Sequence, residues 1–319
     1  TEMATEETIR IGVLADIQTR SVGSYEHDAV DRVLDADPDV IIIAGDVFQG
    51  GEREFDVEVD GFAELMSRLS APHGVYAVEG NIDRVAWLAE MTEGTEVQVL
   101  VDDIVELDIR GQVVRIGGSR DDWSSDESTD MIDELARSDP GDLAILVSHR
   151  PDAVMGLPAD STVDVTISGH THGGQVVVPF VGPLITFSDV PRSVARGGLH
   201  DVSGNLIYQS TGVGLERAGA PQVRFLNRPS IGILGVGPGR AEHEQRAPVI
   251  AAEHAREGRV GRRQPADGRS VDAASSLDHP DDLRTDGIGV PDSARRIECA
   301  AVRSGSRHLG PDTGIGERA

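Results

Sequence analysis

Two closely spaced histidines offer the clearest chemistry in this sequence. Residues 168–175 read Ser-Gly-His-Thr-His-Gly-Gly-Gln and follow an apolar run, residues 163–167, that predicts a strand. If the backbone stays extended there, His170 and His172 project to roughly the same side. Neutral imidazoles arranged in this way bind divalent metal ions. The alternative is a loop with two solvated histidines, so the motif alone leaves metal binding open.

Other residues with metal-binding side chains follow apolar runs elsewhere in the chain. Five expected strands end, in order, at Asp16, Asp46, Asn81, His149 and His170. In an α/β sheet the carboxyl ends of the strands lie along one rim, where such folds place their sites. These residue types also begin turns and cap helices. Five in succession are hard to attribute to turn chemistry alone, so the pattern favours a metal site at this rim.

The expected ligand set mixes carboxylate, amide oxygen and imidazole and contains no cysteine. Such a set suits Mn²⁺, Fe²⁺ or Zn²⁺ better than it suits a structural zinc ion. The ligands are too many for one ion. Two ions about 3.5–4 Å apart, bridged by a carboxylate, fit better, and such a pair clamps a phosphoryl group.

The elements that must position these residues alternate along the chain as in an α/β protein. Apolar runs predict strands at residues 9–15, 40–44, 75–78, 143–147 and 163–167. Amphipathic stretches predict helices at residues 25–36, 59–69, 84–91 and 126–138. Short apolar runs predict hairpin-linked antiparallel strands between residues 96 and 116, and further short strands at 176–178, 205–210 and 222–226.

The composition limits the possible partners. The chain of 319 residues carries a formal charge of −26, and all 29 of its basic residues are arginine. A surface this acidic repels nucleic acid and anionic lipid. Because the acidic residues are scattered through the chain, we favour a protein from a high-salt organism over an acidic protein with a cationic partner.

The redox and targeting signals are few. Cys299 is the single cysteine, which excludes an intrachain disulfide and a cysteine-based zinc site. The first eight residues are polar and acidic, unlike a signal peptide, and no apolar run approaches membrane-spanning length. We therefore expect a cytoplasmic protein without stable membrane insertion, whose oligomeric state the sequence leaves open.

The character of the sequence changes near residue 237. Residues 238–319 hold 13 arginines and 14 acidic residues, a net charge of −1, whereas residues 1–237 carry −25. The second segment lacks a periodic apolar pattern and is rich in Arg, Gly, Ser, Pro and Ala, which predicts a disordered tail. Translation out of frame would also explain the change. The catalytic domain is therefore expected within residues 1–237.

The ordered motifs resemble those of the calcineurin-like metallophosphoesterase superfamily, in particular its bacterial and archaeal phosphodiesterase branch. They are Asp16-x-Gln18, Gly45-Asp46, Gly80-Asn81-x-Asp83, Ser148-His149 and Gly169-His170-x-His172. The resemblance covers about residues 9–236. It implies a four-layer α/β/β/α sandwich with metal ligands on loops at the carboxyl ends of the strands.

The resemblance also implies a role for each matching residue. Asp16, Gln18, Asp46 and His172 would hold the first ion. The second ion would be held by Asp46, Asn81, His149 and His170, with Asp46 bridging the two. A hydroxide bridging the metals would then attack the phosphorus of a small phosphate ester.

Two positions depart from the family pattern. Gln18 stands where the family usually has histidine, and as a weak, hard oxygen donor it favours Mn²⁺ or Mg²⁺ over Zn²⁺. Ile82 occupies the position of the usual general-acid histidine, so the catalytic residue there is unknown; losing a general acid costs roughly 10²–10⁴-fold in rate. Asp83, which often orients that histidine, is left to cap the following helix.

Three functions follow from these residues. The first is a dinuclear-metal phosphoesterase, most directly a phosphodiesterase acting on a substrate with a good leaving group. The second is a degenerate member of the superfamily that serves as a binding scaffold, which Gln18 and Ile82 favour and the five retained ligands oppose. A nucleic-acid phosphodiesterase shares the chemistry but needs a basic groove, which the charge disfavours.

Overall fold

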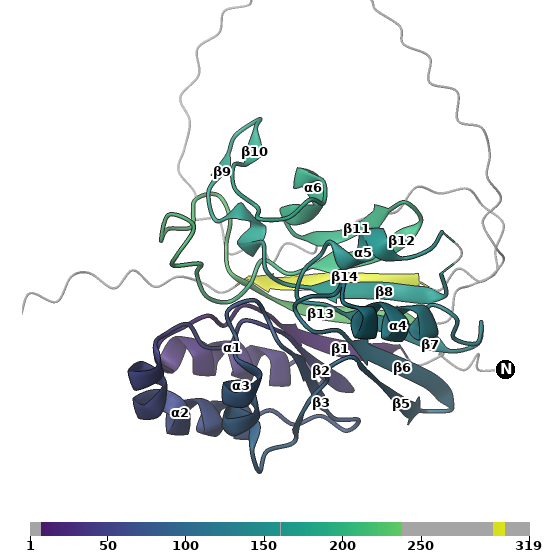
Figure 1. The fold of residues 1–319 in the computed structure, drawn as a ribbon, viewed down its shortest axis with the longest axis horizontal. Helices are drawn as coiled ribbons and strands as arrows, with labels where there is room; N and C mark the ends of the chain where they lie inside the picture. Colours follow the sequence, from purple (N-terminus) through teal and green to yellow (C-terminus); the bar gives the residue numbers. More distant parts are fainter. Residues whose placement is uncertain (1–7, 160, 238–295, 304–319) are drawn as a thin grey trace, which may run out of the picture. The chain divides into compact units, whose positions relative to one another are not determined.

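The computed structural model describes residues 8–159, 161–237 and 296–303, the last of these by backbone alone (Figure 1). Two six-stranded sheets and one two-stranded ribbon make up the β structure of these residues. Among them, no helix combines the length and apolar character needed to cross a membrane.

The first sheet has the strand order β14-β13-β1-β2-β3-β4. Its strands are β1 (Ile9–Leu14), β2 (Val40–Ala44), β3 (Val75–Val78), β4 (Val97–Val99), β13 (Ser230–Gly237) and β14 (Arg296–Arg303). Strands β1 to β4 are parallel, and β13 runs antiparallel to β1 and to β14. Strands β2 and β3 are buried along their whole length. This burial is what their continuous apolar runs predicted.

The second sheet has the order β11-β12-β8-β7-β6-β5. Its strands are β5 (Asp103–Ile109), β6 (Gln112–Gly118), β7 (Leu143–Val147), β8 (Val163–Ser168), β11 (Gly198–Val202) and β12 (Asn205–Gln209). Its four central strands are parallel, and an antiparallel hairpin forms each edge. A separate ribbon, β9 (Val177–Val178) and β10 (Gly182–Pro183), follows the 3₁₀ turn η1 (His172–Gly174).

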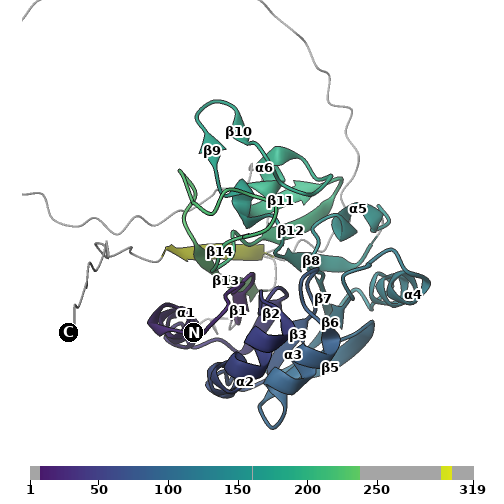
Figure 2. The same cartoon turned by 60° about the vertical axis from the view of Figure 1, so that its left-hand side comes forward.

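Helices cover the outer face of each sheet. The first sheet packs against α1 (Ser24–Leu34), α2 (Glu52–Ser67) and α3 (Val85–Thr92), whose buried side chains form one cluster with those of β2 and β3. The second sheet packs against α4 (Asp126–Leu135), α5 (Ala153–Gly156) and α6 (Arg192–Ala195) in the same way. The expected α/β/β/α layering is therefore confirmed (Figure 2).

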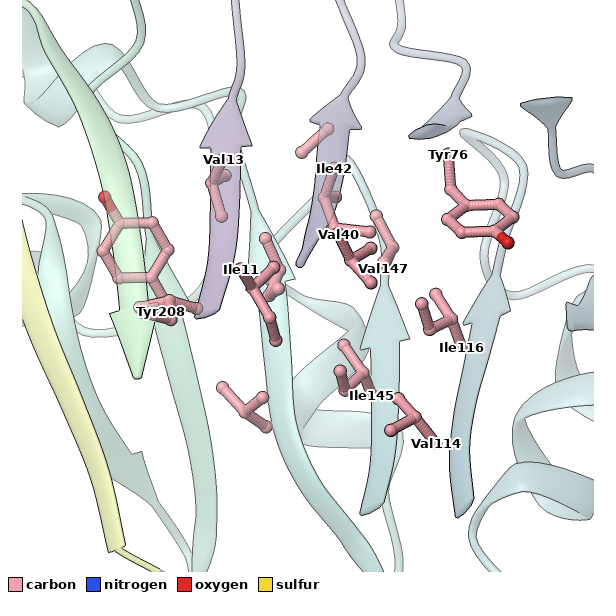
Figure 3. Packing of buried hydrophobic residues seen from close by; sticks show 14 of the residues in the cluster. Ile11, Val13, Val40, Ile42, Tyr76, Val114, Ile116, Ile145, Val147 and Tyr208 are labelled. Atoms are coloured by element: carbon pink, nitrogen blue, oxygen red, sulfur yellow. The ribbon is translucent and has the colours of Figure 1, made fainter. Parts of the chain in front are cut away.

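The inner faces of the two sheets pack on each other. Figure 3 shows Ile11 and Ile42 of the first sheet beside Ile116 and Ile145 of the second, with Tyr208 filling one end. This layer is almost wholly aliphatic, which follows from an aromatic content of 3%. Each side chain of this size stabilises the fold by about 1.5–3 kcal/mol when fully buried.

Three expected elements differ in the structure. Helix α2 begins at Glu52, seven residues earlier than predicted, because the Glu54 carboxylate accepts a hydrogen bond from the Gly51 amide (2.7 Å) and closes the first turn. Strand β4 joins β3 in the first sheet instead of forming a hairpin with β5. Residues 222–226 make only an isolated bridge, between Val176 and Phe225, and extend neither of the two sheets.

Part of the expected tail has regular structure. Residues 296–303 form β14 and pair with the whole of β13. Strand β13, at the edge of the first sheet, supplies their backbone hydrogen-bond partners. Amino-acid composition alone does not indicate such a pairing. Residues 238–295 and 304–319 lie outside the described residues.

Candidate metal centre

The sequence-predicted ligands leave their strands at one end of the two sheets. Asp16 and Asp46 follow β1 and β2 by two residues, and Asn81 follows β3 by three. His149 and His170 follow β7 and β8 in the second sheet. Strands β1, β2 and β3 are parallel, as are β7 and β8, so each sheet delivers its ligands to a single rim.

The two aspartates lie on loops that are hydrogen-bonded to each other. The Asp16 amide donates to the Gly45 carbonyl (2.9 Å), and the Gln18 amide donates to the Asp46 carbonyl (2.9 Å). Both carboxylates are almost fully buried. Oxygen and nitrogen atoms of Asp16, Asp46 and His149 lie within 4.8 Å of one another, close enough to share an ion.

The imidazole of His149 is oriented by a backbone carbonyl. Its Nδ1 atom hydrogen-bonds to the Ala44 carbonyl (2.8 Å), so the N–H is on Nδ1 and Nε2 faces the site. The Nε2 atom lies 3.3 Å from Asp46 Oδ2 and 3.1 Å from Asn81 Oδ1. A neutral imidazole would thus direct a lone pair at two oxygen acceptors. Metal-binding histidines have this arrangement, in which a carbonyl holds one nitrogen and frees the other for a cation.

His170 is held in the same manner. Its Nε2 atom donates to the Phe187 carbonyl (2.9 Å), which leaves Nδ1 2.7 Å from Asn81 Oδ1. Its backbone amide donates to Asp16 Oδ1 (2.8 Å). The Nε2 atom of His172 lies 3.6 Å from the same oxygen, Asp16 Oδ1.

The expectation of an extended backbone between the two histidines is wrong. His170 and His172 have φ angles of +74° and +49°, and η1 begins at the second of them. The segment turns sharply because Thr171 Oγ1 donates to the Ala195 carbonyl and the Gly174 amide donates back to the Thr171 carbonyl. The His172 imidazole still reaches Asp16 and the His170 imidazole reaches Asn81, but both do so from a turn.

The side-chain amide of Gln18 is held at its nitrogen end. Its Nε2 atom donates to Glu216 Oε2 (3.0 Å), so the side-chain amide has a fixed orientation and Oε1 points away from Glu216. Oε1 is buried and has no hydrogen-bond partner among the described residues. Glu216 is in turn held by Gln175, whose Oε1 accepts from the Glu216 amide (2.8 Å). Neither Glu216 nor this role of Gln175 was predicted from the sequence.

Three buried ligand atoms lack partners. Within the described part of the chain, Asp16 Oδ2, Gln18 Oε1 and His172 Nε2 make no hydrogen bond. A buried polar atom without a partner is costly, and in native structures such atoms usually have an ion, a water molecule or a catalytic role beside them. Eleven buried side-chain atoms of the described residues lack a hydrogen-bond partner, and these three belong to the predicted ligand set, so the residues fit a divalent cation.

The pKa values of the metal-free centre agree with this reading. Burial lowers the pKa of His170 to about 4 and that of His172 to about 3, with help from His149 and Arg224 respectively. Both imidazoles are therefore neutral near pH 7, the form that binds metals. Burial also raises the pKa of Asp16 to about 7, with the charge of Asp46 adding to the effect.

His149 and Asp46 form a coupled pair. Burial lowers the pKa of His149, but the Asp46 carboxylate outweighs this and raises it to about 10. Conversely, burial raises the pKa of Asp46, and the His149 charge brings it below the usual range. In the metal-free chain a proton on His149 thus lies between the two groups. A metal cation would take its place and supply the same compensating charge.

The prediction that Asp83 caps the following helix is wrong. Helix α3 has Arg84 at its N-cap, and the Asp83 carboxylate accepts instead from the amides of Asp46 (2.7 Å), Val47 (2.9 Å) and Gly80 (2.9 Å). Burial raises the pKa of Asp83 to about 7. The residue therefore fixes the loop that carries Asp46, a task that needs no histidine at position 82.

The neighbouring backbone completes the support of Asp46. The Ile82 amide donates to Asp46 Oδ1 (3.1 Å). A methyl group added at Gly80 would lie 2.0 Å from the same oxygen, so only glycine leaves the carboxylate in place. The side chain of Ile82 has no acidic proton to give to a leaving group. Its backbone N–H has a different task, which is to support the Asp46 carboxylate.

Two arginines near the motifs are occupied elsewhere. The Arg84 guanidinium lies 4.1 Å from the centre of the Trp87 ring, in a cation–π contact. Arg150 forms a two-point ion pair with Asp121, at 2.7 and 3.0 Å. Trp87 also stacks on Phe55, with ring centroids 4.6 Å apart, so it is a packing residue.

Comparison with known proteins agrees with the fold. Residues 9–174, about half of the chain, match the family model of the calcineurin-like phosphoesterases, and the chain belongs to this family.

Three relatives illustrate the likeness. The uncharacterized metallophosphoesterase YkuE of Bacillus subtilis is 29% identical over 208 residues, 63% of this chain and 69% of that protein. Phosphodiesterase YaeI of Escherichia coli is 26% identical over 197 residues, 59% and 67% of the two chains. A Caenorhabditis elegans protein, F40B5.2, is 30% identical over 224 residues, or 64% of this chain, and the match spans only 44% of its own length.

Proposed function

We propose that this protein is a phosphoester hydrolase that depends on two divalent metal ions, and that its substrate is a small phosphodiester. The observation that carries the proposal is the set of unpartnered ligand atoms, Asp16 Oδ2, Gln18 Oε1 and His172 Nε2, buried at one rim in a calcineurin-like phosphoesterase. The phosphodiesterase named among the relatives supports the choice of a diester.

The ligands divide into two groups around the shared carboxylate of Asp46. Asp16, Gln18 and His172 would hold one ion with it. The other ion would be held by Asp46 with the remaining three predicted ligands, Asn81, His149 and His170. When bound, the two ions would stabilise the negative charge of the phosphoryl oxygens. They would also lower the pKa of water, so that hydroxide is available as the nucleophile near neutral pH.

The residues of the chain have three tasks in this reaction. Ala44 and Phe187 hold the two imidazoles, through their carbonyls, in the orientation that binding needs. Asp83 and the Ile82 amide fix the bridging carboxylate. Asn81 is exposed, so the second group of ligands opens to solvent, where a substrate can enter.

The leaving group limits the substrate. At position 82 the chain offers an isoleucine side chain and no acid to protonate a departing alkoxide. Esters whose alcohol has a low pKa leave without such help and lose least. We therefore expect activated phosphodiesters to be hydrolysed faster than alkyl monoesters.

Manganese is the ion that this ligand set favours. Gln18 and Asn81 both offer amide oxygens, which are hard donors, and the set contains no thiolate. Hard oxygen donors mixed with imidazole suit Mn²⁺ or Mg²⁺ more than Zn²⁺. The acidic, lysine-free composition supports localisation in the cytoplasm of a high-salt organism.

The test joins metal content to hydrolysis of bis-p-nitrophenyl phosphate. The full chain, in about 2 M KCl to screen its charge, is loaded with Mn²⁺ and compared with Asp46→Ala. We expect two ions per wild-type chain and a rate that falls roughly 100-fold or more in the variant. Asp35→Ala, an exposed carboxylate change on α1, is the matched control and should keep both values.

A second candidate function, a metal-free binding scaffold, is favoured by one observation: Ile82 replaces the usual acid while its backbone still supports Asp46. The same experiment separates the two functions. A folded chain that binds no Mn²⁺ and hydrolyses nothing above the Asp46→Ala control would exclude the enzyme and leave the scaffold.

A further inference from the structure

Large apolar side chains gather on the surface beside the metal centre. We call the following eight residues the apolar patch: Phe180, Val181, Leu184, Ile185, Phe187, Val223, Phe225 and Leu226. Phe180, at the tip of the β9–β10 ribbon, is fully exposed, and the other seven are each at least 40% exposed. An apolar surface of this kind usually marks an interaction site.

The residues of the patch lie on three segments, two of which are hydrogen-bonded to each other. The ribbon is tied to the segment 223–226 by two backbone hydrogen bonds, from the Phe225 amide to the Gln175 carbonyl and from the Val177 amide to the Phe225 carbonyl (both 2.9 Å). The ring of Phe187 lies against Gly219, so close that an added Cβ would be 2.7 Å from it. In both views the ribbon projects away from the two sheets (Figures 1 and 2).

The patch also adjoins the candidate ligands. The Phe187 carbonyl accepts the hydrogen bond that orients His170 (2.9 Å). Gln175, whose carbonyl anchors Phe225, closes the turn that begins at His172. Whatever covers the patch therefore lies next to the metal centre.

The charge of this region is opposite to that of the rest of the chain. Residues 176–229 contain five arginines and three acidic residues, a net charge of +2, whereas the remaining residues carry −28. Arg192, Arg196 and Arg228 are exposed. None of the ion pairs formed by the described residues includes them.

We propose that the apolar patch docks on the surface of a phospholipid bilayer. A projecting tip with an exposed phenylalanine can insert among acyl chains, and arginines beside it can meet the headgroup phosphates. A whole-chain charge of −26 predicted repulsion from anionic lipid, but repulsion acts only over about 8 Å at physiological salt. The charges near the patch, including the three exposed arginines, therefore govern the contact.

This origin of binding predicts an unusual salt dependence. At low salt the acidic remainder of the chain opposes the approach to a negative surface, and added salt screens that repulsion. Apolar insertion is not screened. Binding should therefore strengthen as KCl is raised from about 20 mM to about 500 mM, whereas attraction through the arginines alone would weaken.

The experiment is co-sedimentation of the full chain with vesicles of phosphatidylcholine and phosphatidylglycerol, four to one, across that salt range. The wild type is compared with Phe180→Ser/Leu184→Ser and with Val57→Ser, a matched loss of an apolar side chain that is 75% exposed on α2. We expect the double variant to bind at least ~10-fold more weakly and Val57→Ser to bind like the wild type. Both should keep the metal content and rate on the soluble diester.

Three results would overturn the proposal. The wild type could fail to sediment with vesicles at every salt concentration. The double variant could bind as tightly as the wild type. Finally, analytical ultracentrifugation without lipid could show a wild-type dimer that the double variant converts to a monomer while vesicle binding is absent, which would assign the patch to a second copy of the chain.

Discussion

Five of the seven predicted ligands occupy the left-handed region of backbone conformation. The residues with positive φ are Asp16 (+48°), Gln18 (+38°), Asp46 (+57°), His170 (+74°) and His172 (+49°). Residues other than glycine lose about 1–2 kcal/mol in this region. Such conformations persist where the surrounding contacts hold them, as the hydrogen bonds between the β1 and β2 loops do here. Strain at this rim is therefore concentrated on the residues that would bind the ions.

Glu216 gives the first prediction at the residue scale. Its carboxylate fixes the amide of Gln18, so Glu216→Ala should lower the affinity for Mn²⁺ about 10-fold, the usual effect of losing a residue that orients a ligand. Glu216→Gln should recover most of the affinity because its amide oxygen can accept the same hydrogen bond. Isothermal titration calorimetry with Mn²⁺ measures both values.

The control for this prediction is a double-mutant cycle. Once Gln18→Ala has removed the oriented side chain, Glu216→Ala should cause no further loss of Mn²⁺ affinity. Losses that simply add would instead mean that Glu216 acts on the loop 214–219, where it also accepts from the Gly219 amide (3.0 Å).

At the scale of elements, a polar connection joins the two sheets far along the strands from the metal centre. Asp39, which precedes β2, accepts from the Arg10 amide of β1 (2.8 Å) and from both ends of the Arg110 guanidinium (2.7 and 2.9 Å). Arg110 lies in the turn between β5 and β6 of the other sheet. Burial raises the pKa of Asp39, but the hydrogen bonds from Arg110 outweigh it and hold the pKa below 3.8.

Asp39→Asn should therefore destabilise the fold in a pH-dependent way. Because the pKa is depressed in the folded state, the stabilisation is complete above about pH 4 and is lost as the pH falls through the folded-state value. Since the pair is partly exposed, we expect a deficit of about 1–2 kcal/mol at pH 7 and pH 5. Below pH 4 the deficit should shrink.

Urea unfolding of the metal-free chain at each pH measures this deficit. Asp35→Asn, an exposed change of the same charge on the same segment, serves as control and should cost less than about 0.5 kcal/mol. A deficit that grows toward acid pH would refute the assigned role of Arg110.

At the scale of the whole molecule, the charge of −26 sets the response to salt. Like charges repel one another in the compact state, and salt screens them over the Debye length, which falls from about 10 Å at 0.1 M to about 3 Å at 1 M. The melting temperature of the full chain, measured by circular dichroism in EDTA, should rise by roughly 5–10 °C from low to high KCl. A melting temperature that is flat or falls would contradict the proposed adaptation to high salt.

The order of the candidate ligands along the strands, and their place at one rim, could be predicted from the sequence alone. Apolar runs identify buried strands, the residue that follows each run is local information, and parallel strands bring their carboxyl ends to one rim. Asp16, Asp46, Asn81, His149 and His170 were found in this way, and the α/β/β/α layering followed from the family resemblance carried by those motifs.

Only the tertiary structure decided what surrounds these residues. Glu216 reaches Gln18 across 198 positions, and Phe225 reaches Gln175 across 50. Asp83 accepts a hydrogen bond from the Asp46 loop and does not cap the helix that follows it. Strand β14 pairs with β13 at the edge of the first sheet, which the composition of residues 238–319 could not indicate. Sequence patterns indicate the hydrophobic period of each helix or strand and the residue at which it ends. Which side chains meet across the chain depends on how distant segments turn and pair, and that is fixed when the two sheets pack.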